Sequence, residues 1–153
     1  MGRTTWTLIA AAVLAGAIWA MTNRASFIAD DRTAGSASRL AAPAAGAAIT
    51  AVSLPASLSP EAEIGKRVFE ATCASCHGLN ADGRNGAGPP LVHRTYEPSH
   101  HADIAFAMAV RNGVRAHHWE FGDMPPIEES LTDGEIGYVV RYVRELQRAN
   151  GIE

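Results

Sequence analysis

Two cysteines and a histidine stand within residues 73–77, and they constrain this chain more than any other feature. The pattern is C-x-x-C-H, and Cys73 and Cys76 are the only cysteines among the 153 residues. In this pattern both thiols can bond covalently to a porphyrin while the adjacent imidazole, here His77, ligates its iron. The motif therefore predicts one covalently bound haem c and a fold that encloses it.

The cysteine pair has three possible interpretations besides haem attachment. A redox-active dithiol would accompany a βαβ unit, but no alternating strand pattern surrounds the motif. A zinc site would need further ligands, and His93 and His100 follow at gaps just outside the usual zinc-finger ranges. The third interpretation is chance, with two buried thiols that happen to lie close together. The haem interpretation is favoured over all of them.

The N-terminal segment, 1–24, is predicted to enter a membrane. Residues 4–23 carry no charge and stand between Arg3 and Arg24. As a helix this stretch would extend about 30 Å, the thickness of a bilayer hydrocarbon core. A cleaved signal peptide is the alternative. The haem domain would then lie on the periplasmic side of a bacterial inner membrane, or be soluble in the periplasm after cleavage.

Composition changes between residues 25 and 58. This segment contains two repetitive stretches, 34–38 and 41–48, which consist of small residues without periodic apolar positions. Such a sequence cannot bury enough apolar surface to offset the entropy cost of ordering. It predicts a flexible Ala/Pro/Ser-rich linker over 25–58, with a partly helical spacer as the alternative. One small domain, 59–153, follows, and a buried haem would supply apolar surface that so short a domain lacks.

Local signals predict three helices in the domain 59–153. The first begins with Ser59 as a cap and Pro60 at the first helical position. A middle helix is predicted over 99–112, where apolar positions recur at helical spacing. The third follows the capping box at 132–135, Thr-Asp-Gly-Glu. Its apolar stripe consists of Ile136, Val139, Val140, Val143 and Leu146.

Two further expectations concern side chains on these helices. Met108 lies on the apolar face of the middle helix and is predicted to pack in the core. Arg141, Arg144 and Arg148 lie off the apolar stripe of the last helix, the later ones near its negative end.

These motifs, in this order, resemble those of class I cytochromes c, the monohaem, soluble-type family. Gly65 and Phe69 precede the first cysteine at four-residue intervals, as in that family. The resemblance covers 59–153 and implies an all-α cytochrome c fold, with three to four helices around the haem. An N-terminal transmembrane or signal helix would be added to it. Gly65 would let two helix backbones cross where Val139 and Tyr142 lie.

The resemblance also implies the axial ligands of the iron. His77 would occupy one axial position, and the carbonyl of Pro89 would accept the second N–H of its ring. Met124, in the sequence Gly-Asp-Met-Pro-Pro, resembles the methionine of the family and would be the sixth ligand. His117 and His118 are the alternative ligands. Five histidines besides His77 are unusual in so small a domain, and the sequence offers no account of them.

Charge restricts the partners of the domain. Residues 59–153 contain nine Lys and Arg against fourteen Asp and Glu, a net charge of −5. A nucleic-acid partner is therefore not expected, because phosphate binding needs a basic face. Acidic residues near the methionine predict steering of a basic redox partner, or a merely solvated face. These residues are Glu120, Asp123, Glu128, Glu129, Asp133 and Glu135.

Together these features predict a membrane-tethered monohaem c-type cytochrome that carries single electrons between periplasmic or membrane redox partners. An enzymatic activity or a small-molecule substrate is not expected, because two filled axial positions leave the iron no open site. Two other functions remain open. One is a haem-based sensor or gas-binding module, and the other is a dedicated electron-transfer subunit of an oxidase or dehydrogenase complex.

Overall fold

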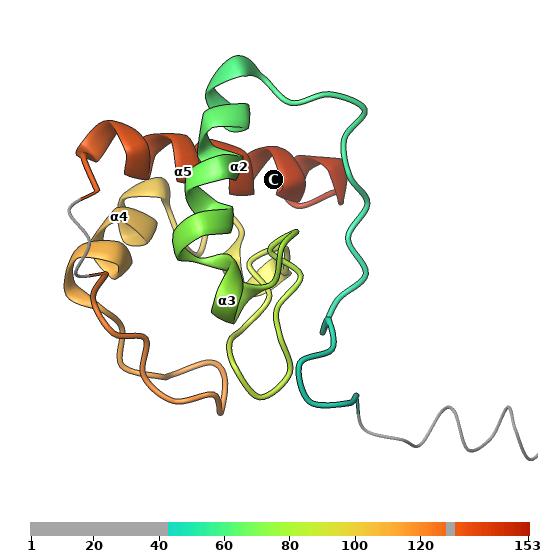
Figure 1. Ribbon diagram of the computed structural model, residues 1–153, viewed down its shortest axis with the longest axis vertical. Helices are drawn as coiled ribbons and strands as arrows, with labels where there is room; N and C mark the ends of the chain where they lie inside the picture. Colours follow the sequence, from blue (N-terminus) through green and yellow to red (C-terminus); the bar gives the residue numbers. More distant parts are fainter. Residues whose placement is uncertain (1–42, 128–130) are drawn as a thin grey trace, which may run out of the picture. The chain divides into compact units, whose positions relative to one another are not determined.

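The computed structural model describes residues 43–127 and 131–153, so the predicted membrane segment 1–24 lies outside the described residues. Within these ranges the chain forms helices and loops, and it contains isolated β-bridges but no strand (Figure 1). The fold is therefore all-α, as predicted. No helix in the same ranges is both long and apolar enough to cross a bilayer. The elements are α2 (Pro60–Thr72), α3 (Ala74–His77), η1 (Arg94–Tyr96), α4 (Asp103–Asn112) and α5 (Asp133–Ala149).

Helix α2 begins where its capping residues predict. The Ser59 hydroxyl accepts a hydrogen bond from the amide of Ala62 at 3.2 Å, which satisfies one free N–H of the first turn. The same hydroxyl donates to the carboxylate of Glu145 on α5 at 2.6 Å. The cap therefore also fixes the start of α2 against the C-terminal helix.

The capping box of α5 is present, as predicted. Thr132 accepts from the amide of Glu135 at 3.2 Å, and the Glu135 carboxylate accepts from the amide of Thr132 at 2.8 Å. The Thr132 bonds lower the pKa of Glu135. All five residues of the predicted apolar stripe are buried. Both the start and the buried face of α5 are thus encoded locally.

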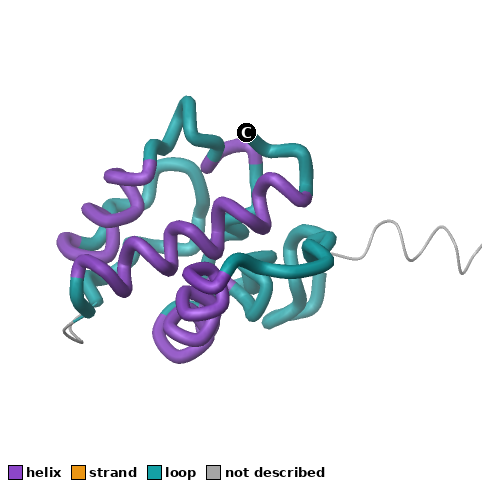
Figure 2. Tube along the Cα trace, turned by 90° about the horizontal axis from the view of Figure 1, so that it is seen from above, coloured by secondary structure: helices purple, strands orange, loops and turns teal. Residues whose placement is uncertain are grey.

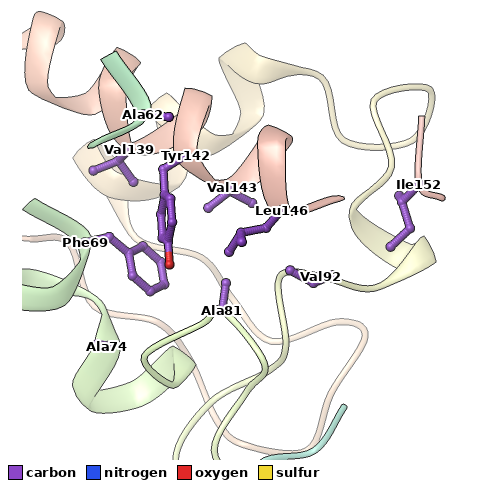
Figure 3. Close-up of a cluster of buried hydrophobic side chains, with 10 residues drawn as sticks. All are labelled: Ala62, Phe69, Ala74, Ala81, Val92, Val139, Tyr142, Val143, Leu146 and Ile152. Atoms are coloured by element: carbon purple, nitrogen blue, oxygen red, sulfur yellow. The ribbon is translucent and has the colours of Figure 1, made fainter. Parts of the chain in front are cut away.

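The core is centred on the crossing of α2 and α5. In Figure 2 α2 is viewed almost end-on and α5 passes across it. Gly65 makes the crossing possible, because a Cβ atom there would stand 1.9 Å from the carbonyl oxygen of Tyr138. Phe69 and Tyr142 pack beside it with ring centroids 5.5 Å apart, and both are almost fully buried (Figure 3). The packing expected from the resemblance is confirmed.

Tyr142 also connects the crossing to the loop after α3. Its hydroxyl donates a 3.2 Å hydrogen bond to the carbonyl of Leu79. Burial raises the pKa of Tyr142 to about 12, and the charges of Glu70, Asp82 and Glu63 act in the same direction. The phenol therefore keeps its proton at neutral pH and remains a hydrogen-bond donor.

The middle helix differs from its prediction. It begins at Asp103 rather than at residue 99, because the amides of His100 and His101 both bond to the carbonyl of Glu97 and form a separate turn. Met108 is 54% exposed, so the prediction that it packs in the core is wrong. Ile104 on the same helix is 69% exposed. Met108 instead lines the cavity described in the next section, so it faces that cavity rather than the protein core.

The second part of the predicted linker, 43–58, is bonded to the domain. The amide of Ile49 donates to the carbonyl of Asp82 at 3.1 Å. The amide of Ser53 donates to the Asn150 side chain at 2.8 Å, and that side chain donates back to the Ser53 carbonyl at 2.9 Å. The compact unit therefore begins at residue 43 rather than 59. The composition of segment 43–58 could not predict this packing, because the residues that bond to the segment are distant in the sequence.

Candidate haem-binding site

One cavity brings most of the predicted site residues together. Its volume is about 390 Å³, and Cys73, His77 and Met124 all line it. Cys76 is exposed and is not part of this wall. The wall is mainly apolar, as in most cofactor sites. Its apolar residues include Phe69, Leu91, Phe106, Val110, Val139 and Val140.

His77, at the end of α3, is oriented by a backbone carbonyl. Its Nδ1 lies 2.9 Å from the carbonyl oxygen of Pro89, which can only accept, so Nδ1 donates the proton. This tautomer leaves Nε2 with a free lone pair. Burial lowers the pKa of His77, and the bond to Pro89 opposes that shift. The neutral ring that metal binding requires is thus favoured.

The loop that carries Pro89 is held against the attachment motif. Gly88 lies so close to the motif that a Cβ atom on it would stand 2.8 Å from the carbonyl oxygen of Cys76. Further along, the amide of Leu91 donates to the carbonyl of Ala81 at 2.8 Å. A glycine at the close approach and a fixed loop after it together place the proline carbonyl beside the histidine.

Met124 is held by a two-bond bridge. Its amide and carbonyl pair with the carbonyl and amide of Val114, both at 2.9 Å. Gly113 allows this approach, because a Cβ atom there would stand 2.6 Å from the Met124 carbonyl oxygen. The residues between Val114 and Met124 form a closed loop, named here the 114–124 loop. Its last residue, Met124, is part of the cavity wall.

The alternative ligands line the same cavity. His117 and His118, from the 114–124 loop, are part of its wall, and Met108 from α4 is as well. Lining the cavity therefore does not decide whether Met124 or one of the two histidines is the sixth ligand of the iron. Met124 as the sixth ligand stays a prediction, and its test is described below.

One residue of the cavity wall, Trp119, carries a buried polar atom, and the rest of the wall is mainly apolar. The indole Nε1–H of Trp119 is buried and has no hydrogen-bond partner among residues 43–127 and 131–153. The hydroxyl of Tyr96 is a neighbour but does not meet hydrogen-bond geometry with it. Solvent does not reach the indole nitrogen, so it lies behind the open surface of the cavity. A porphyrin is largely apolar and fits this mainly apolar wall, in which His77 offers a free imidazole nitrogen to its iron.

Arg144 is a structural residue that the sequence analysis missed. Its side chain is buried, and it donates to the carbonyl of Tyr96 at 2.7 Å, to the carbonyl of His101, and to Gln147 at 2.6 Å. A fourth bond, 2.7 Å long, reaches Asp103. The guanidinium thus fixes the segment that leads into α4. Its only signal in the sequence was its place directly after a residue of the apolar stripe.

A covalent haem motif in an all-α domain with an apolar cavity defines the class of c-type cytochromes, which carry electrons. The family model described as "Cytochrome C oxidase, cbb3-type, subunit III" matches residues 60–143, more than half of the chain. The chain belongs to this family of cytochrome c domains, and its cofactor is covalently bound haem c.

Known proteins show one further similarity. Cytochrome c-L of Methylorubrum extorquens is 30% identical over 82 residues, which are 54% of this chain and 38% of that protein. The match thus spans well under two thirds of the length of this relative. No solved structure matches the chain at a significant level.

Proposed function

We propose that this chain is a membrane-tethered monohaem cytochrome that passes single electrons between redox proteins at the periplasmic face of a bacterial inner membrane. The observation that carries the proposal is the cavity that His77 and Met124 share beside the attachment motif. Two axial ligands of this kind leave the iron without an open position. Electron transfer through the haem, rather than reaction with a substrate, then follows.

Each residue of the site has a role in this proposal. Cys73 and Cys76 hold the porphyrin through thioether bonds. His77 ligates the iron through Nε2, because Pro89 engages Nδ1. Met124 provides a soft sulfur ligand, which stabilises the ferrous state. When bound, the haem supplies a one-electron couple, and the apolar wall excludes water from around it.

The location and partners are part of the proposal. Segment 1–24 would anchor the chain in the membrane, with signal cleavage and a soluble periplasmic domain as the alternative. An anchor would keep the haem near membrane-bound donors and acceptors and so raise their effective concentration. The acidic surface favours a basic protein partner, and the excess of acidic residues disfavours nucleic acid.

The description of the matching family favours a second candidate, a resident electron-transfer subunit of an oxidase complex. The two candidates differ in where the chain is found after mild detergent extraction of membranes. A resident subunit co-purifies with a larger haem-containing enzyme, whereas a carrier separates from it. A chain recovered in the soluble periplasmic fraction would contradict the anchor in both.

Replacing Met124 with alanine is expected to abolish the weak long-wavelength sulfur-to-iron charge-transfer band of the ferric protein. The reduction potential should fall as well, because the soft ligand is lost. The measurement is an absorption spectrum with a redox titration. Met108→Ala is the matched control, because Met108 is a second thioether in the same cavity wall. The charge-transfer band should persist in the Met108→Ala protein.

Other outcomes reassign the sixth ligand. Loss of the band in Met108→Ala alone would make Met108 the ligand. A low-spin spectrum without the band in the wild type, unchanged in Met124→Ala, would assign the position to a histidine such as His117 or His118. A high-spin wild type that binds CO in the ferrous state would replace the carrier with a sensor.

A further inference from the structure

Two pairs of adjacent histidines, distant in the sequence, meet at one place in the fold. His100 and His101 precede α4, and His117 and His118 belong to the 114–124 loop. One ring nitrogen from each of His100, His101 and His118 lies within 4.8 Å of the others. The ring centroids of these three are 4.7, 5.3 and 5.3 Å apart.

We propose that His100, His101 and His118 form a second metal site, distinct from the haem iron, which binds a divalent transition-metal ion of the Zn²⁺ or Cu²⁺ type. Imidazole is a preferred ligand of both ions. Three imidazoles without a carboxylate do not suit Mg²⁺ or Ca²⁺, which prefer oxygen ligands. Three protein ligands also leave a fourth position of the ion for water.

The best-fixed ligand is His101. Its Nδ1 lies 2.7 Å from the carbonyl oxygen of Thr95 and donates to it, so Nε2 keeps a free lone pair. Its own carbonyl accepts from the buried guanidinium of Arg144. A backbone carbonyl that holds the second ring nitrogen is the usual outer support of a metal-bound histidine. The proposed site therefore has a preorganised member.

The electrostatics of the cluster favour a bound ion over protonated rings. None of the three histidines forms an ion pair with a carboxylate in the described part of the chain. Desolvation lowers the pKa of His118, and the neighbouring charges of His117, His101 and His100 lower it further. Neutral imidazoles are the form that ligates metal ions.

The position of the site gives it a consequence for the haem cavity. His101 and His118 both line that cavity. An ion bound by His100, His101 and His118 would link the turn before α4 to the 114–124 loop, which ends at Met124. Metal binding is thus expected to stabilise the loop that carries the proposed sixth ligand. The metal site itself stands whether or not Met124 ligates the iron.

The test uses the full-length ferric holoprotein in detergent, purified without a histidine tag. Both cysteines are then bonded to haem and do not compete for metal. Calorimetric titration with Zn²⁺ is expected to show one equivalent bound, and Mg²⁺ should show none. Zn²⁺ should also raise the melting temperature, because ligands that bind only the folded state stabilise it.

Variants locate the ion. His100→Gln and His118→Gln should each weaken Zn²⁺ binding by at least ~10-fold, the lower limit for loss of a supporting residue around a metal. Both residues are exposed, so folding should be preserved, as an unchanged haem spectrum would show. His117→Gln is the matched control: it neighbours His118 but is not one of the three ligands, and it should keep the wild-type affinity.

Cu²⁺ provides a second readout. Added to the ferric protein, it should give an electron paramagnetic resonance spectrum with nitrogen hyperfine structure that His118→Gln changes. The proposal is overturned if Zn²⁺ binds equally to the wild type and to both variants, or does not bind at all. It is also overturned if His118→Gln alters the low-spin haem spectrum before any metal is added, since His118 would then ligate the haem iron.

Discussion

Replacing Gly65 with alanine is expected to leave little folded domain. The added Cβ atom would stand 1.9 Å from the carbonyl oxygen of Tyr138 and 2.4 Å from its carbonyl carbon. These are backbone atoms of α5, so they cannot rotate away as a side chain could. We expect a loss of about 3 kcal/mol or more, the upper end for overpacked cores and a large part of a small domain's stability.

The sign of this effect is informative because helix propensity predicts the opposite. In an exposed helix interior, alanine is more stable than glycine by about 1 kcal/mol. Gly137 on α5 provides that comparison, since a Cβ atom there would meet nothing within 4 Å. Gly137→Ala should therefore stabilise the domain modestly. Urea unfolding of both variants measures the difference, and a Gly65→Ala protein as stable as the wild type would refute the proposed crossing.

Arg144→Met is expected to destabilise the domain by about 3–5 kcal/mol, the cost of breaking a buried charged network. Methionine keeps an apolar stem of similar length but removes every donor. The carbonyl of His101 would then be left without a hydrogen bond, whereas the carbonyl of Tyr96 would lose Arg144 but keep its 3.0 Å bond from Gln147. Unsatisfied buried acceptors cost about 1–3 kcal/mol each. Urea unfolding of the holoprotein, followed by circular dichroism, gives the value.

Two controls separate the carbonyl bonds from the ion pair. The Asp103 side chain is 71% exposed, so its pairing with Arg144 is screened by solvent. Asp103→Asn should therefore cost less than about 1 kcal/mol. Arg141→Met, at an exposed position of the same helix, should lie within about 0.5 kcal/mol of the wild type. Equal stability of the Arg144 and Arg141 variants would contradict the role of the buried network.

Features of the fold that depend on nearby residues were predictable from the sequence. The Ser59 cap, the capping box of α5 and its buried stripe each lie within a few turns of one helix. The contact between His77 and the Pro89 carbonyl, and the glycine crossing at Gly65, were available from the resemblance. The caps and the stripe are local to one helix, whereas the Pro89 contact and the Gly65 crossing were predicted because the motifs of the family include both partners.

Features that depend on distant partners were not predictable. Arg144 is buried because backbone carbonyls from another segment accept its hydrogen bonds. No sequence pattern within α5 predicts the presence of those carbonyls. Residues 43–58 are fixed by Asp82 and Asn150, far along the chain. The surplus of histidines was evident, but only the fold brings His118 to His100 and His101.

The bonded segment 43–58 has a mechanical consequence. A pull on the chain from its N-terminal side would first load the bonds of residues 43–47 to Asn85, and then those between Ile49 and Asp82 and between Ser53 and Asn150. Only after these had peeled apart would the force reach Ser59 and the start of α2. A force applied before residue 43 would thus be dissipated before it could distort the crossing helices, and the haem site would be insulated from it.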